Sequence, residues 1–114
     1  MTDRNDPNYF YIDEKMPEYL ENILEATRAP EERGLSWLSG ILESGAPKED
    51  FDRIMGVAKE YALRAGRKYM TPQDIRSAAE DTLSLTLILG SRAESGGLEI
   101  EDVVRRILDS IETP

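Results

Sequence analysis

The sequence of 114 residues contains no cysteine and no histidine. Without cysteine the chain can form no disulfide, no thiolate zinc site and no thiol nucleophile, which agrees with the cytoplasmic location that we expect. Without histidine it lacks the usual general base and the commonest metal ligand. These two absences exclude thiol chemistry and every catalytic or metal site that depends on an imidazole.

The sequence also lacks long apolar runs and a surplus of basic residues. No segment is long and apolar enough to cross a bilayer, and the N-terminus, MTDRNDPNY, is too polar for a signal peptide. The chain has 14 Lys and Arg against 23 Asp and Glu, a formal net charge of −9. A duplex-binding protein normally has the opposite imbalance, because it must neutralise phosphates. We therefore expect neither a membrane nor a nucleic acid as a partner.

Motifs for phosphate binding and catalysis are missing as well. The sequence has no GxxxxGK[ST], no GxGxxG after a strand and no DxDxDG calcium loop. A serine nucleophile would need a lysine or carboxylate as its base, and no spacing pairs them. We expect no enzyme activity from this chain alone, and no catalytic residue, metal site or cofactor of its own.

The sequence does contain the apolar residues of one small helical domain. Hydrophobic residues make up 39% and charged residues 32% of the chain, enough for a single modest core. Residues 1–13 are polar apart from three aromatics at 9–11 and are expected to be a tail or linker, with a helical domain over 14–114. An apolar stripe at helical spacing predicts a first helix that stops before Pro30. The stripe consists of Met16, Tyr19, Leu20, Ile23 and Leu24.

The segment after this helix is rich in glycine. Gly34 and Gly40 bracket the apolar Leu35, Trp37 and Leu38, which predicts a loop with at most a short helix. Pro47 is expected to open the next helix, because proline suits the first turn. Gly66 is expected to end that helix, because glycine adopts positive φ without strain. The predicted buried face of that helix is Phe51, Ile54, Met55, Ala58, Ala62 and Ala65.

A third helix starts with a strong signal at Thr71-Pro-Gln-Asp74, where threonine suits the N-cap, proline N1 and an acid N3. Its predicted inward residues are Ile75, Ala78, Ala79 and Thr82 or Leu83. Alternation in LSLTLIL indicates a short extended piece, or one short strand, near 85–89, and SRAESGG is expected to be a flexible turn. The last helix has a stripe of Ile100, Val103, Val104, Ile107, Leu108 and Ile111. We therefore expect an all-α fold, a small bundle of about four helices.

Four residues are candidates for an interface. Arg64, Arg67 and Lys68 lie at or just past the end of the second predicted helix. They either complement the helix dipole, worth roughly 0.3–1 kcal/mol each, or contact a phosphate or an acidic partner, and capping is the commoner role. Trp37 is the only tryptophan. It either covers the small core or anchors a partner.

Three stretches, EATRAPEERGLSWLSGILESGAP, ALRAGRKYMTPQDI and EIEDVVRRILDSI, together resemble the C-terminal lid of MoxR-type AAA+ ATPases. The likeness runs from Tyr19 to Ile111, and the GR-Y-TP-D turn is its most specific part. The matching positions are Ala26-Thr27-Arg28, Gly45-Ala46, Gly66-Arg67, Tyr69, Thr71-Pro72, Asp74-Ile75 and Val103 to Leu108.

The resemblance implies a helical lid that packs on a nucleotide-binding core and on the neighbouring subunit during ATP-driven remodelling. ATP and Mg²⁺ would belong to the parent assembly, often with a von Willebrand-type partner protein. The core is missing from these residues, so we expect an excised lid or a free-standing lid-like protein. The family has an arginine in a "GASPRA" turn that can reach the nucleotide phosphates. Here the turn reads GAPKED, with Glu49 at the arginine position, where a carboxylate would repel phosphate. Lys48 is therefore the candidate nucleotide-binding residue, provided that the turn shifts.

The stretch GRKYMTPQDIRSA is also similar to the turn between the second and third helices of histone folds. A histone fold would need a central helix several turns longer than 47–65 permits, and normally a basic surface for DNA. Acidic histone-fold pairs that bind other proteins do exist. The alternative hypothesis is therefore a histone-fold-like or other small acidic helical interaction module, which an obligate dimer would favour.

Overall fold

The computed structural model describes residues 5–114, apart from the side chain of Glu94. Its α-helices are α1 (Lys15–Arg28), α2 (Asp50–Arg64), α3 (Pro72–Thr86), α4 (Ser91–Ser95) and α5 (Ile100–Ser110). The remaining elements are the 3₁₀ helices η1 (Pro30–Arg33) and η2 (Ser36–Leu38) and the antiparallel strands β1 (Leu42–Ser44) and β2 (Ile88–Leu89). The prediction of an all-α helical bundle with one small extended region is confirmed.

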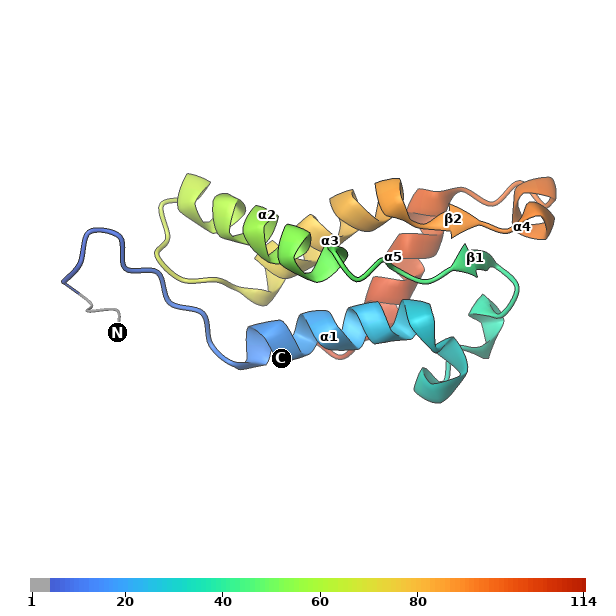
Figure 1. Cartoon of the computed structure of the whole chain (residues 1–114), viewed down its shortest axis with the longest axis horizontal. Coiled ribbons are helices and arrows are strands. Elements are labelled where there is room, and N and C mark those ends of the chain that lie inside the picture. The colour runs from blue at the N-terminus through green and yellow to red at the C-terminus, as the bar shows by residue number, and fades with distance from the viewer. Residues whose placement is uncertain (1–4) are drawn as a thin grey trace.

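The helices form an elongated bundle, and the chain as a whole extends over 54 × 25 × 21 Å (Figure 1). Helices α2 and α3 run in opposite directions and share the most extensive contact of any two elements. Helix α1 packs across this pair, and α5 packs on the other side of α3. The elbow between α2 and α3, residues 65–71, lies at one end of the long axis, whereas the small sheet and α4 lie at the other.

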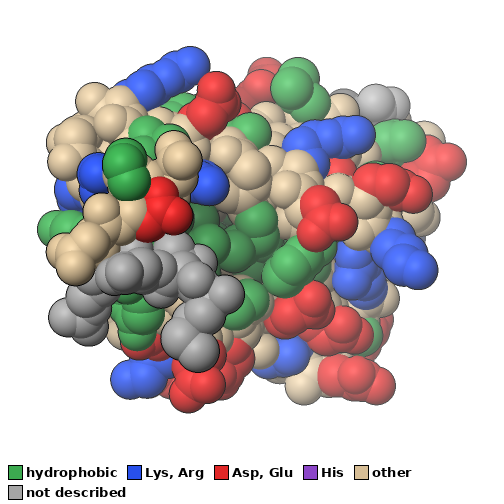
Figure 2. Space-filling view, turned by 60° about the vertical axis from the view of Figure 1, so that its left-hand side comes forward, with side chains coloured by type: hydrophobic (Ala, Val, Ile, Leu, Met, Phe, Trp, Pro, Cys, Tyr) green, Lys and Arg blue, Asp and Glu red, His purple; other side chains and the backbone are tan. Residues whose placement is uncertain are grey.

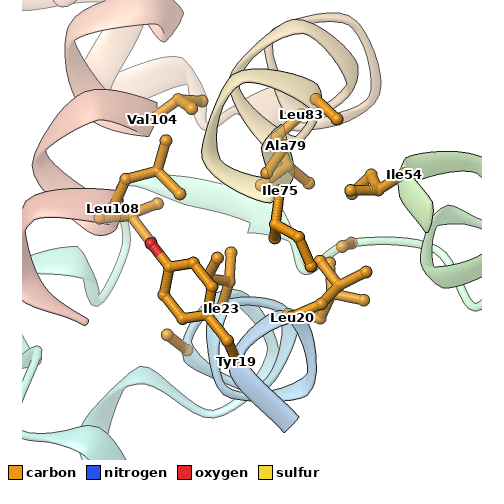
Figure 3. Close-up of a cluster of buried hydrophobic side chains, with 14 of the residues drawn as sticks. Tyr19, Leu20, Ile23, Ile54, Ile75, Ala79, Leu83, Val104 and Leu108 are labelled. Atoms are coloured by element: carbon orange, nitrogen blue, oxygen red, sulfur yellow. The ribbon is translucent and has the colours of Figure 1, made fainter. Parts of the chain in front are cut away.

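Helix α3 occupies the centre of the core because its buried positions repeat at helical spacing (Figure 3). Its side chains lie between those of α2 on one side and α5 on the other, with α1 below. Ala78 and Ala79 are fully buried, and their small size lets the neighbouring helices approach closely. The large side chains that are fully buried include Tyr19, Leu20, Ile23, Ile54, Ile75, Leu83, Val104 and Leu108. Each buried aliphatic side chain contributes about 1.5–3 kcal/mol of transfer free energy.

Helix α2 begins later than the sequence predicted. Residues 48 and 49 form a turn, and the Asp50 N–H donates to the Pro47 carbonyl at 3.1 Å, so the first helical residue is Asp50. The helix ends at Arg64, and Gly66 adopts φ +78°, as expected of the residue that stops it. Ala65 lies past the last turn and is exposed, so its predicted place in the core is wrong.

The predicted extended piece is shorter than expected. The Leu87 N–H still donates to the Leu83 carbonyl at 2.9 Å, so residues 83–86 are helical and only Ile88–Leu89 forms a strand. That strand pairs with β1, which the sequence did not predict. The first five residues of SRAESGG form α4, and only the glycines that follow make the expected turn.

The N-terminal segment lies along the elbow. Tyr11 and Tyr69 form an isolated parallel bridge, in which the Tyr11 N–H donates to the Lys68 carbonyl at 2.8 Å and the Met70 N–H to the Tyr11 carbonyl at 3.1 Å. The Lys68 Nζ donates to the Pro7 carbonyl at 3.2 Å. Residues 1–4 of the predicted tail lie outside the described part of the chain.

Two further observations concern the fold class. The longest helices between residues 5 and 114, α2 and α3, have 15 residues each, so the long central helix of a histone fold is not found there. The histone-type alternative is therefore wrong as a description of this fold. None of the described helices has the length and apolar character that crossing a membrane requires.

Candidate functional site

The GAPKED turn, residues 45–50, is fastened to the end of α1 by side-chain hydrogen bonds. The Thr27 hydroxyl donates to the Leu24 carbonyl at 2.7 Å and accepts from the Ala46 N–H at 2.9 Å. The Arg28 guanidinium donates through Nε to the Ala46 carbonyl at 3.0 Å and through a terminal nitrogen to the Pro47 carbonyl at 3.2 Å. Three of the turn's backbone polar groups are thus satisfied by two adjacent side chains of α1.

Gly45 lets this turn approach α1 closely. A Cβ at residue 45 would lie 2.7 Å from the Arg28 Cα and 2.7 Å from the Thr27 carbonyl oxygen, which is closer than atoms of this kind can pack. The requirement is for space, since the φ of Gly45 is not positive. The family-like motifs at 26–28 and 45–46, which are 17 or more positions apart in the sequence, therefore form one structural unit.

The far side of the same turn is fixed by Asp50, the first residue of α2. Its side chain is fully buried, and one carboxylate oxygen accepts from the Thr86 hydroxyl at 2.6 Å. The other oxygen accepts from the Arg53 guanidinium at 3.4 Å. Because a buried carboxylate is costly unless it is hydrogen-bonded, this contact ties the start of α2 to the end of α3. The sequence placed Asp50 in the first turn of a helix but gave no sign of its burial or of its partner Thr86.

The side chains of Lys48 and Glu49 project from this fixed turn. Both are exposed, and neither takes part in a side-chain hydrogen bond or ion pair with any residue in the range 5–114. Glu49 is the N-cap residue of α2 and makes no side-chain cap bond. Arg28 is also exposed beside them. The turn thus presents two cations and one anion around a hydrogen-bonded backbone, an arrangement that can contact a partner or an anion.

The elbow is closed by an ion pair that the sequence did not predict. The Arg67 guanidinium donates to both carboxylate oxygens of Asp74, at 2.6 and 2.8 Å. Asp74 also accepts from the Thr71 N–H at 2.9 Å, and its own N–H donates to the Thr71 hydroxyl at 3.3 Å, which completes the predicted cap of α3. The hydrogen bond from Arg67 lowers the pKa of the Asp74 carboxyl below its ordinary value, while burial acts in the opposite direction.

The three cations in and next to the elbow have different environments. Arg67 is engaged inside the protein, with 27% of its side chain exposed, whereas Arg64 is 72% exposed and lies 3.8 Å from the Glu60 carboxylate. Lys68 is held by the Pro7 carbonyl. Figure 2, which brings this end of the molecule forward, shows acidic, basic and hydrophobic side chains interspersed. The elbow is not a single basic surface, and its role as an interface stays a prediction.

Trp37, the remaining interface candidate, lies at the opposite end of the bundle. It is half-buried in η2 and packs against the core, as expected of a residue that covers it. The Arg106 guanidinium of α5 lies over its ring, 4.0 Å from the centroid. The structure therefore separates the four candidates, with Arg67 and Lys68 in the elbow, Arg64 next to it at the end of α2, and Trp37 beside the sheet. Among residues 5–114, no group of three or more acidic side chains is arranged to hold a metal ion.

Comparisons with known proteins agree with the motif pattern. The chain is 28% identical over 104 residues to Chaperone MoxR1 of Mycobacterium tuberculosis. The aligned residues cover 91% of this chain and 28% of that protein. It is 28% identical over 102 residues to the uncharacterized protein YeaC of Bacillus subtilis, covering 90% of this chain and 29% of YeaC. No protein-family model matches the chain.

A solved structure shares the fold. The crystal structure of a candidate ATPase from Cytophaga hutchinsonii superposes with a TM-score of 0.87 and 31% sequence identity, over 97% of this chain and 34% of that protein. The chain thus spans about a third or less of the proteins that it matches. The resemblance to the C-terminal domain of MoxR-type AAA+ ATPases is confirmed by these likenesses.

Proposed function

We propose that this chain is the non-catalytic lid of a MoxR-type AAA+ ATPase. It would pack on a nucleotide-binding core and on the neighbouring subunit of a ring during ATP-driven remodelling. The observation that carries the proposal is the hydrogen bonding of the GAPKED turn to α1. The family-like residues Thr27 and Arg28 make hydrogen bonds to its backbone, and Gly45 allows its close approach to α1. A lid that transmits movement needs such a rigid connection between its helices, since a mobile turn would absorb the displacement.

ATP and Mg²⁺ would belong to the parent assembly. Two features support this division: the sequence has no GxxxxGK[ST] motif, and the Glu49 carboxylate is exposed where the family has an arginine. The exposed cations beside Glu49 are Arg28 and Lys48, and Lys48 stays the candidate contact to nucleotide phosphates. The lid would therefore follow the state of the core through packing contacts. The family resemblance adds a von Willebrand-type partner to the proposal. The cysteine-free composition adds a cytoplasmic location.

A chimera tests this function directly. In the Cytophaga hutchinsonii protein, the third of the chain that matches would be replaced by this sequence, since the two superpose closely there. We expect the chimera to assemble and to hydrolyse ATP faster than the same protein with the segment deleted. Sedimentation velocity and a phosphate-release assay give the two readouts.

A remote surface change provides the control. Glu21 of α1 is exposed, so a chimera with Glu21→Lys should behave like the unmodified chimera. A chimera whose circular dichroism shows a folded protein, but which assembles and hydrolyses no better than the deletion, would contradict the proposal.

A further inference from the structure

The segment of residues 7–11, which we call the strap, is docked on the elbow at one end of the molecule (Figure 1). Its central contact is the bridge in which Tyr11 donates to the Lys68 carbonyl and accepts from the Met70 N–H. The Lys68 Nζ adds a third hydrogen bond, to the Pro7 carbonyl. The strap therefore covers the backbone edge of the elbow in the manner of an added β-strand.

One side chain of the strap supports these backbone contacts. Phe10 is half-buried and packs against the core, and the Lys59 ammonium of α2 lies 5.3 Å from its ring centroid. Tyr11, by contrast, is 48% exposed, and its bridge partner Tyr69 is 50% exposed. The strap is thus held by three hydrogen bonds and one half-buried ring, whereas the helices are held by a continuous core. Segments with so few buried contacts open more readily than the core does.

The helices next to the strap are secured without it. The Lys15 N–H donates to an Asp13 carboxylate oxygen at 2.9 Å, and the Met16 N–H donates to the Asp13 carbonyl at 2.9 Å. These contacts fix the start of α1 and follow the strap in the sequence. The ion pair between Arg67 and Asp74 closes the elbow from within. Loss of the strap would therefore leave both the start of α1 and the elbow in place.

We infer that the strap has two states, docked on the elbow and detached from it, and that the helical bundle stays folded in both. In the docked state the Lys68 carbonyl and the Met70 N–H are covered. In the detached state both groups face solvent, and the segment ahead of α1 no longer follows the elbow. This opening is a property of the chain itself and does not depend on the lid role.

Hydrogen exchange of the full chain measures this opening, because one movement exposes two amides. The Tyr11 and Met70 amides should have protection factors within about threefold of each other and at least about a hundredfold below that of Ala79, in the centre of α3. Protection equal to that of Ala79 would overturn the proposal, because the strap would then open only when the whole chain unfolds. An unprotected Tyr11 amide would overturn it too, because the docked state would not be populated.

Two matched pairs of variants test the contacts that hold the strap. Lys68→Met removes one hydrogen bond and should speed exchange of the Tyr11 amide about threefold to tenfold. Arg64→Met makes the same change in charge at an exposed residue next to the elbow and should leave that rate unchanged. Phe10→Ser should speed the exchange about tenfold or more, whereas Leu85→Ser, at the other end of α3, should not. Equal effects within both pairs would contradict the assigned contacts.

A reversible crosslink holds the strap in one state. The natural chain has no cysteine, so the double variant Tyr11→Cys/Tyr69→Cys can form only one intramolecular disulfide. Paired strand residues lie at a separation that a disulfide can span. Oxidation should slow exchange of the Met70 amide at least about tenfold, and reduction should restore it, with an unchanged circular dichroism spectrum. Equal exchange in the oxidised and reduced forms would show that the Met70 amide opens without the strap, against the proposal.

The consequence for ATP turnover rests on the proposed function. In a C-terminal lid the strap would join the core to α1, so its detachment would lengthen that connection. The chimera described above, with this cysteine pair and no other cysteine, should hydrolyse ATP at least about threefold more slowly when oxidised than when reduced. The Tyr69→Cys single variant is the control for the reductant. Equal rates would exclude this use of the strap. A chimera that fails to assemble in either form would instead count against the proposed function, while the exchange results on the chain alone would stand.

Discussion

Arg67 and Asp74 close the elbow between α2 and α3 with two hydrogen bonds of 2.6 and 2.8 Å, one to each carboxylate oxygen. Asp74 is only 5% exposed and is also the N3 residue of the α3 cap. The elbow is therefore held by a bidentate ion pair, and the family-like GR-Y-TP-D sequence supplies both of its members.

Replacement of Arg67 by alanine should lower the free energy of unfolding by about 2–4 kcal/mol, because it leaves a largely buried carboxylate with only its Thr71 contacts. Arg67→Lys should cost less, but it should not restore full stability, since lysine cannot make the bidentate contact. Urea unfolding followed by circular dichroism measures both. A loss below about 0.5 kcal/mol, typical of an exposed pair, would show that the contact is not maintained in solution.

The same pair predicts a specific dependence on pH. The pKa of Asp74 is lower in the folded chain than its ordinary value of 3.8. Its contribution is therefore fully present above the unfolded pKa and is lost as the pH falls through the folded pKa. Stability of the natural chain should fall more steeply below pH 4 than that of Asp74→Asn. Urea titrations at several pH values between 7 and 2 test this, and parallel curves for the two proteins would exclude it.

Two glycines should respond in opposite ways to alanine. Gly45→Ala places a Cβ 2.7 Å from backbone atoms of α1, so the turn must move, at a cost of about 1–3 kcal/mol. Gly56→Ala adds a Cβ in open space on the exposed face of α2 and should stabilise the chain by about 0.5–1 kcal/mol. Thermal unfolding of both variants gives the comparison. A stable Gly45→Ala protein would mean that the turn lies further from α1.

The Thr27 hydroxyl should be needed for its hydrogen bonds rather than its size. Thr27→Val keeps the shape but leaves the buried Ala46 N–H without an acceptor, which should cost about 1–3 kcal/mol. Thr27→Ser retains the hydroxyl and should cost much less. Hydrogen exchange of the Ala46 amide gives an independent readout, because protection should fall in the valine variant only.

Charge at residue 49 should control any contact between the GAPKED turn and nucleotide phosphates in the chimera described above. Glu49→Arg should raise the affinity for ATP about tenfold, as it replaces a repulsive group with the residue that the family has there. Glu21→Arg, on the exposed surface of α1, provides the control for net charge. Equilibrium binding of a fluorescent ATP analogue measures the change. An unchanged affinity would indicate that the turn does not face the nucleotide.

Sequence periodicity predicted the buried faces of the helices well, because those faces depend on spacing within one segment. Ile75, Ala78 and Ala79 lie inside as expected, and Thr71 and Asp74 form the predicted cap. The alternation of apolar residues over 83–89 predicted too long an extended piece, because the backbone stays helical through Thr86. Leu85 lies on the outer face of that helix and is 87% exposed.

The parts that could not be predicted depend on contacts between distant segments. Pro47 is a suitable first helical residue, but its carbonyl accepts a hydrogen bond from Arg28, which lies 19 positions earlier in the sequence. Pro47 therefore belongs to the turn, and the helix begins at Asp50. The buried Asp50 is satisfied by Thr86, 36 positions further along. No local pattern marks such pairs. The resemblance to MoxR-type proteins, by contrast, singled out Thr27-Arg28 and Gly45-Ala46, and the structure brings these two distant motifs into contact.

The parallel bridge between Tyr11 and Tyr69 determines where mechanical force would enter this domain. The strap of residues 7–11 contacts the elbow through Lys68, which lies 61 positions from Pro7, before the chain reaches α1. Tension applied to the polypeptide ahead of Tyr11 would load this bridge in shear and would reach the joint between α2 and α3 first. A pull on the N-terminal segment would thus be transmitted to the elbow first. Helix α1 would be pulled only after residues 7–11 had detached from the elbow.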